Sequence, residues 1–308
     1  MKELLVLMLH EINDVSWFEG ILAYLGKKYQ FISYDALHAV LTGKSDISKA
    51  IHLTFDDGHK SFYTNALPVL KRQKAAATLF VSPQAVQQEE NFWFQRIRPF
   101  DKSKWQAFVI KHAQGHFHSD ISGFSPHSIM KSMPLQTMHQ LITQFETENK
   151  LTLAPYVNVS TQELREIQQS GLVEIGAHTL HHPILANEND KDSANQIRMS
   201  VEGLKDLLNT DVRCFAYPNG QPGDDFGQRE MDTLKSLGIE IAFSTQSSRV
   251  YRGSDLLSIP RVGVSKGNNY FVTQKIRFAR QWQGIKNLVF RQTEQKERKA
   301  LREARIEN

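Results

Sequence analysis

The stretch Leu53-Thr54-Phe55-Asp56-Asp57-Gly58 decides how the rest of this chain is interpreted. Apolar and β-branched residues such as Ile51 precede it and predict a buried strand, and Gly58 predicts a turn where that strand ends. Side chains alternate across a strand, so Asp56 and Asp57 point in different directions unless the turn redirects them. Adjacent carboxylates repel each other unless a cation or hydrogen bonds compensate. The pair therefore indicates a metal ligand beside a base, although the dipeptide alone fits an Asx turn equally well.

Length and composition limit the classes of protein to which this chain can belong. The chain has 308 residues, 40% hydrophobic and 23% charged, which is typical of a globular protein with a substantial core. The net charge of +4 is modest and its excess lies near the C-terminus, so no nucleic acid partner is expected. The single cysteine, Cys214, excludes an internal disulfide and a cysteine-based zinc site. The run Leu4 to Leu9 is too short for a signal peptide and no segment has the ~20 apolar residues of a membrane helix, so a cytoplasmic protein with no integral membrane segment is expected.

Apolar runs alternate with helical patterns along most of the chain. Strands are predicted over Leu4 to Leu9, Ile51 to Asp57, Ala75 to Val81, Val173 to Ala177, Arg213 to Tyr217, Ile239 to Ser244 and Leu256 to Val264. Helices are predicted between them, for example over Thr161 to Gln169, where Ser160 and Glu163 form a capping box. This alternation is typical of an α/β fold with a parallel sheet.

Residues 84 to 156 interrupt the alternation and predict a largely helical or irregular insertion at a strand end. Its aromatic residues form either a small separate core or a surface that stacks on sugar rings, and a core is expected for most of them. Trp93 is the one assigned to substrate binding. Residues 281 to 308 are basic and predict a helical tail that is solvated or frayed, so residues 1 to 280 are expected to form one domain.

His178 and His182 follow directly after a predicted strand and lie four residues apart. That spacing on a helical turn lets both imidazoles reach one metal ion. A lone histidine is more often structural or exposed, but the pair and the distant Asp dipeptide together favour a metal site. Two nitrogens and one oxygen leave an open position for water, which is the arrangement of a catalytic zinc site.

These segments resemble the polysaccharide deacetylase family, also called carbohydrate esterase family 4 or the NodB-homology domain. Thr54-Phe55-Asp56-Asp57-Gly58 and His178-Thr179-Leu180-His181-His182-Pro183 are similar to its first two motifs. The likeness extends to Phe215-Ala216-Tyr217-Pro218-Asn219-Gly220. The resemblance implies an incomplete (β/α) barrel that holds a divalent metal, usually zinc, with Co²⁺ or Ni²⁺ as alternatives.

The resemblance also implies a role for each matching residue. Asp57, His178 and His182 match the metal ligands, and Asp56 matches the general base. The Tyr217 N–H matches the donor that stabilises the tetrahedral oxyanion. The chemistry agrees, because an amide carbonyl needs a Lewis acid to polarise it and a carboxylate to take a proton from the attacking water.

Two motifs depart from the family pattern. Many members have Arg-x-Pro-Tyr where this chain has Ala216-Tyr217-Pro218-Asn219, so the arginine that tunes the catalytic Asp is not at that position. Pro218 and Asn219 are still expected in one wall of the substrate groove. Many members also have Leu-x-His near the end, whose His protonates the leaving amine, where this chain has Ile259-Pro260-Arg261-Val262. Such features resemble the branch found with bacterial surface-polysaccharide and exopolysaccharide synthesis.

The missing histidine leaves the general acid to be found elsewhere. His10, at the end of the first strand, is the best substitute because strand ends of a parallel barrel converge on the site, although it reads equally well as a turn residue. Arg261 orients Asp56, contacts a sugar oxygen as a substrate-binding residue, or pairs with a surface carboxylate.

The predicted function is a metal-dependent hydrolase that removes an N-acetyl group from an amino sugar of a bacterial polysaccharide or glycan precursor. Two alternatives stay open: a catalytically weak carbohydrate-binding relative, and a hydrolase of another non-peptide C–N bond. The missing Leu-x-His favours the weak relative, and the intact Asp56-Asp57 pair with both histidines favours the enzyme more. A cytoplasmic precursor is the expected substrate.

Overall fold

A parallel β-sheet forms the centre of the computed structural model, which describes residues 4–278 and 292–306. The strands are β1 (Leu4–Leu9), β2 (Gln30–Phe31), β3 (Ala50–Phe55), β4 (Ala77–Val81), β5 (Val173–Ala177), β6 (Cys214–Ala216), β7 (Ile241–Phe243) and β8 (Val262–Gly263). The α-helices are α1 (Val15–Gly26), α2 (Tyr34–Leu41), α3 (Leu67–Gln73), α4 (Pro83–Gln88), α5 (Trp93–Arg96), α6 (Lys102–Ala113), α7 (Pro126–Met130), α8 (Leu135–Glu148), α9 (Thr161–Gln169), α10 (Asp190–Leu208), α11 (Gln228–Ser236), α12 (Asn269–Arg277) and α14 (Gln292–Ala304).

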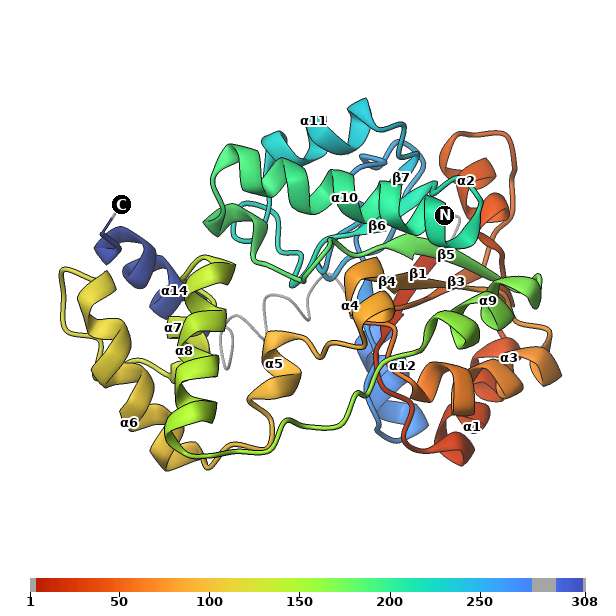
Figure 1. The fold of residues 1–308 in the computed structure, drawn as a ribbon. Coiled ribbons are helices and arrows are strands. Elements are labelled where there is room, and N and C mark those ends of the chain that lie inside the picture. The colour runs from red at the N-terminus through yellow and green to blue at the C-terminus, as the bar shows by residue number, and fades with distance from the viewer. Residues whose placement is uncertain (1–3, 279–291, 307–308) are drawn as a thin grey trace.

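The sheet curls until its two edges approach each other. Its strands run in the order β7-β6-β5-β4-β3-β1-β8, with β2 also paired to β3, and all of these pairings are parallel. Beyond β7, the Ser244 N–H donates to the Ile259 carbonyl, and a few residues later the chain enters β8 beside β1. The predicted incomplete (β/α) barrel is confirmed (Figure 1).

Alternate residues of the strands fill two apolar cores. Leu5, Leu7 and Leu9 of β1 pack in the core beneath the surrounding helices. Leu4 and Val6 pack instead with residues of the distant strands β6 and β7. This separation follows from the two-residue period of a strand that is covered on both faces. Because all the strands are parallel, the carboxyl ends of β1, β3, β5 and β6 lie at the same edge.

The segment predicted as an insertion folds largely into the helices α5 to α8. Most of its aromatic side chains are buried in a core of their own, including Trp105, Phe108 and Phe145. Residues 83–88 do not join this core; they form α4, which packs against α10. We refer to α5 to α8 together as the helical lobe, which lies beside the barrel in Figure 1.

The C-terminal helix α14 packs on the helical lobe. Leu301 is fully buried in the lobe's core, and the His118 N–H donates to the Ala304 carbonyl. The prediction of a solvated or frayed tail is therefore wrong for residues 292–306, because one face of this highly charged helix is buried. Residues 281–291 and 307–308 of the predicted tail lie outside the described residues. Within the described ranges, no helix has both the length and the apolar content needed to cross a bilayer.

Candidate active site

The turn after β3 directs both aspartates to the same edge of the barrel. The Asp56 N–H continues the strand pairing by donating to the Leu9 carbonyl. Asp57 and Gly58 then adopt the left-handed conformation, with φ of 71° and 63°. A Cβ at Gly58 would lie 2.8 Å from Val81 Cγ1, so only glycine fits there. A left-handed aspartate is uncommon and persists only where the surrounding structure enforces it.

The two histidines lie on the loop that follows β5. The His178 N–H donates to the Val81 carbonyl, and the Nδ1 of His178 lies 2.7 Å from the Ala216 carbonyl oxygen. That contact places the proton on Nδ1 and leaves the Nε2 lone pair available for a metal. Thr179 and His182 are both left-handed, with φ of 63° and 59°. The expected helical turn is therefore wrong, and an irregular loop brings the two imidazoles together.

Aromatic residues of the helical lobe hold His182 in place. Its ring lies 5.2 Å from that of Phe92 and 5.0 Å from that of Phe94, between centroids. Both phenylalanines come from the short segment that contains α5. The lobe therefore supports one of the predicted metal ligands directly.

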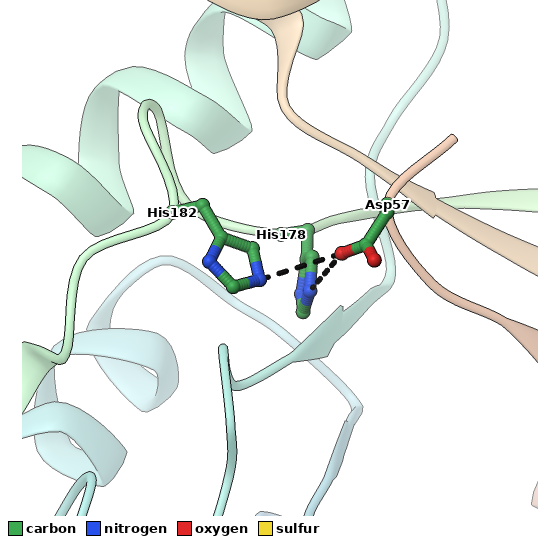
Figure 2. A group of neighbouring side chains, drawn as sticks. All are labelled: Asp57, His178 and His182. Carbon is green, nitrogen blue, oxygen red and sulfur yellow. Dashed lines mark ion pairs between the residues drawn. The ribbon is translucent and has the colours of Figure 1, made fainter. Parts of the chain in front are cut away.

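The side chains of Asp57, His178 and His182 point toward one another (Figure 2), and all three are buried. Asp57 Oδ1 lies 3.5 Å from His178 Nε2 and 3.4 Å from His182 Nε2. Two ligand atoms at about 2.1 Å from a tetrahedral zinc ion are themselves about 3.4 Å apart. Among the described residues, the buried Asp57 Oδ1 accepts no hydrogen bond, which is costly unless a cation satisfies it. The donor set therefore fits a divalent metal.

The charge states of these residues also suit a metal. Burial raises the pKa of Asp57, but the contacts with His178 and His182 outweigh it and hold the pKa well below its usual value. Burial lowers the pKa of His182, and this effect exceeds the opposing influence of Asp57. Asp57 is therefore ionised near neutral pH and His182 is neutral, which are the forms that bind a metal.

Arg261 forms a bidentate ion pair with Asp56. Its Nη1 and Nη2 lie 2.6 and 2.8 Å from the two carboxylate oxygens of Asp56, and its Nε donates to the Ser244 carbonyl. The Arg261 side chain is completely buried. Burial raises the pKa of Asp56, but Arg261, with smaller contributions from His178 and His10, lowers it overall. The carboxylate is thus ionised and fixed in orientation.

This pairing decides among the three roles left open for Arg261. A fully buried guanidinium that is bound to Asp56 reaches neither a sugar oxygen nor a surface carboxylate. This geometry contradicts its assignment to substrate binding and agrees with the alternative that Arg261 orients Asp56. Residues 216–219 contain no arginine, and the arginine that contacts Asp56 is Arg261, which directly precedes β8.

His10 lies where the first strand was expected to bring it. Its Nε2 is 3.9 Å from Asp56 Oδ2, it lines the pocket, and 47% of its side chain is exposed. A substrate can therefore reach this imidazole from the pocket, so the geometry is compatible with a general acid. The acid role itself remains a prediction.

Tyr217 cannot act as predicted in this arrangement. Its N–H donates to the Phe243 carbonyl at 3.2 Å, because the pairing of β6 with β7 continues one residue further than the strand. Its ring is fully buried and stacks on Phe226. The assignment of this N–H as oxyanion donor is therefore contradicted. Pro218 is also buried and does not line the pocket, whereas Asn219 does.

A cavity of about 440 Å³ lies at the carboxyl ends of the strands, and Asp56, Asp57, His178 and His182 are among the residues that line it. Trp93 lines it but is only 1% exposed and packs edge-on against Phe94, so it serves mainly the lobe's core. Phe94 is less buried and lines the same cavity, and it was missed although it follows Trp93 in the sequence. The other lining residues were not foreseen from the sequence: Met8, Glu11, Arg98, His127, Lys131, Gln221, Asp225, Thr245, Glu294, Gln295 and Arg298. The only sequence feature that drew attention to Glu294, Gln295 and Arg298 was the highly charged pattern of the C-terminal segment.

Comparisons with known proteins agree with this geometry. A sequence profile described as polysaccharide deacetylase matches residues 43–242, more than half of the chain. No curated protein matches the sequence. Among solved structures, IcaB from Ammonifex degensii is similar with a TM-score of 0.61 at 21% identity, covering 91% of this chain and 97% of its own.

Two further structures share the fold. The deacetylase PplD from Streptococcus pyogenes, in complex with acetate, has a TM-score of 0.61 at 17% identity and covers 89% of this chain and 98% of its own. The BpsB deacetylase domain from Bordetella bronchiseptica has a TM-score of 0.54 at 18% identity and covers 85% of this chain and 95% of its own. The profile match, the barrel and the gathered motif residues lead to one assignment: this chain belongs to the polysaccharide deacetylase family.

Proposed function

We propose that this protein is a metal-dependent deacetylase that removes the N-acetyl group from an amino sugar of a bacterial polysaccharide or glycan precursor. The observation that carries the proposal is the buried cluster of Asp57, His178 and His182 beside the ionised Asp56. Family membership and the structural neighbours described as deacetylases, PplD and BpsB, support the same reaction class.

Asp57, His178 and His182 would hold the metal, and zinc suits this set of ligands best. When bound, a divalent ion polarises the acyl oxygen of the substrate and lowers the pKa of water. Asp56, ionised and fixed by Arg261, accepts the proton of the attacking water.

Two other residues are proposed to complete the reaction. Asn219 lines the pocket, and its buried Nδ2 has no partner among the described residues, so its amide is a candidate donor to the developing oxyanion in place of Tyr217. His10 is accessible from the pocket and is proposed to protonate the leaving amine.

Acetate release tests the proposal. The purified protein is incubated with an N-acetylglucosamine oligomer and added zinc, and released acetate is compared with that from Asp56→Asn. With rates normalised to the folded fraction of each protein, we expect the loss of the base to lower kcat at least 100-fold. Equal, near-background rates for both proteins, with the oligomer still bound, would instead establish the carbohydrate-binding alternative. The expected cytoplasmic location stays a prediction, which fractionation of producing cells tests.

A further inference from the structure

One side of the active-site pocket is built from parts of the chain that lie far apart in sequence. Lys131 directly follows α7 of the helical lobe, Asp225 lies on the loop after β6, and Glu294, Gln295 and Arg298 lie on α14. We call these five residues the α14 wall. The α14 helix also lies outside residues 43–242, which the family profile matches.

Ion pairs join the α14 wall to both neighbouring parts of the molecule. Lys131 Nζ lies 2.9 Å from Glu294 Oε1, which ties the lobe to α14. Arg298 Nη2 lies 2.5 Å from Asp225 Oδ1, which ties α14 to the barrel. Each charge on this wall thus has a counter-charge, so the wall does not select an anionic ligand. It offers donors and acceptors side by side, as a sugar with several hydroxyl groups requires.

Arg298 also carries a hydrogen-bond donor that the described residues do not satisfy. Its side chain is 5% exposed and lines the pocket. One of its nitrogens pairs with Asp225, but the buried Nε has no acceptor among the described residues. Leaving a buried donor of a charged group unsatisfied is costly. The same side chain lines the pocket, so a ligand oxygen there would lie against it.

We infer that the α14 wall binds the sugar unit that adjoins the one losing its acetyl group. This inference rests on the proposed function. The metal-ligand cluster and the wall line the same cavity of about 440 Å³. That volume lies within the range of about 300–1,000 Å³ in which small-ligand pockets fall. The pocket therefore accepts a short, uncharged segment of N-acetylhexosamine units, with its hydroxyl and acetamide groups facing Arg298 and Gln295. The Gln295 Nε2 already donates to Asp224 Oδ2 at 3.1 Å, which holds this amide in place on the wall.

Variants of α14 test the inference on the full-length, zinc-loaded protein. Arg298→Met removes the guanidinium, Gln295→Leu removes an amide, and Lys299→Gln is the control because Lys299 is 78% exposed on the same helix. We measure kcat and KM for acetate release from N-acetylglucosamine and its trimer. Arg298→Met should raise KM for the trimer about tenfold and Gln295→Leu about threefold, with kcat changed less than twofold. The control should match wild type.

The monosaccharide distinguishes recognition from structural damage. A variant that weakens binding of the adjoining sugar leaves KM for the monosaccharide unchanged, whereas distortion of the whole pocket raises both. Equal shifts for the two substrates, or an unchanged KM for the trimer in both variants, would overturn the inference. If Arg298→Met lowers the melting temperature by more than about 5 °C, Gln295→Leu decides.

Binding measurements separate this inference from the proposed function. Titration of the trimer into zinc-loaded Asp56→Asn, with and without Gln295→Leu, reports affinity without turnover. A trimer that binds more weakly to the double variant supports the wall even if the wild type releases no acetate. If the wild type releases acetate and Gln295→Leu does not change the affinity for the trimer, the inference about the α14 wall is refuted and the proposed deacetylase function still stands.

Discussion

The Arg261–Asp56 pair should behave as a buried, mutually dependent unit, and Arg261→Met is the perturbation that exposes it. The two side chains are 0% and 3% exposed and share two charge-assisted hydrogen bonds of 2.6 and 2.8 Å. Water therefore cannot replace the missing guanidinium. Removing one partner of such a pair costs about 3–5 kcal/mol of unfolding free energy, because a buried charge is left without compensation.

A double-mutant cycle measures this dependence. Arg261→Met and Asp56→Asn each leave one polar partner alone, so each should destabilise the protein strongly. The double variant buries no full charge, and it should lose at least about 2 kcal/mol less than the sum of the two. Arg261→Lys keeps the charge without the bidentate geometry and should fall between wild type and Arg261→Met.

Urea denaturation at pH 7, with zinc fixed in excess and tryptophan fluorescence as the signal, gives the four unfolding free energies. Acetate release from the same proteins should fall with Arg261→Met even where most molecules are folded, because Asp56 loses its orientation. A loss below about 1 kcal/mol for Arg261→Met, or additive single effects, would refute the reasoning.

Three further predictions concern the core, the metal and α14. Burial lowers the pKa of His52 to about 4 in the folded protein, against about 6.5 when unfolded, so this residue should contribute a loss of about 3 kcal/mol in unfolding free energy as the pH drops from about 6.5 to 4. Burial also lowers the pKa of His127 and His139 to about 4, so His52→Gln should reduce, and not abolish, the loss that urea denaturation shows over this pH range. An unchanged loss in His52→Gln would contradict the prediction. Zinc should raise the melting temperature of the wild type but not of Asp57→Ala, because the variant lacks one of the three proposed ligands. After dialysis, Asp57→Ala should retain less zinc than the wild type. Equal zinc content in the two proteins would contradict the ligand assignment. Leu301→Ala should weaken the docking of α14 on the helical lobe, because it removes a fully buried side chain. Hydrogen exchange should then be faster for the amides of residues 292–304 and unchanged for those of β1 and β3. An equal increase in exchange rate in both regions would argue against local docking.

The sequence carried enough information for the barrel and for the metal-ligand cluster. Strand periodicity identified β1, β3 and β5, and a parallel sheet brings the ends of such strands to one edge whatever lies between them. Asp57, His178 and His182 were therefore placed correctly in space from motif and strand context alone. The backbone that achieves this was not predictable in detail, because left-handed Thr179 and His182 follow from tertiary contacts.

Other errors arose where pairing between distant residues decides the outcome. The strand pairing that engages the Tyr217 N–H depends on β7, whose register no local pattern specifies. The burial of Arg261 depends on its fit to Asp56 across the barrel. The docking of α14 depends on Leu301, a single apolar residue in a charged run, and on ion pairs to Lys131 and Asp225. Such matches are properties of the assembled chain.

The position of Arg261 in the chain also has a consequence for synthesis. Asp56 and Arg261 are 205 residues apart, and β8, which follows Arg261, pairs with β1. A ribosome-bound chain that has formed β1, β3 and β4 would still lack the counter-ion for the buried carboxylate at the end of β3. Such a nascent chain should therefore stay protease-sensitive, and the barrel should become resistant only after residue 261 has left the exit tunnel.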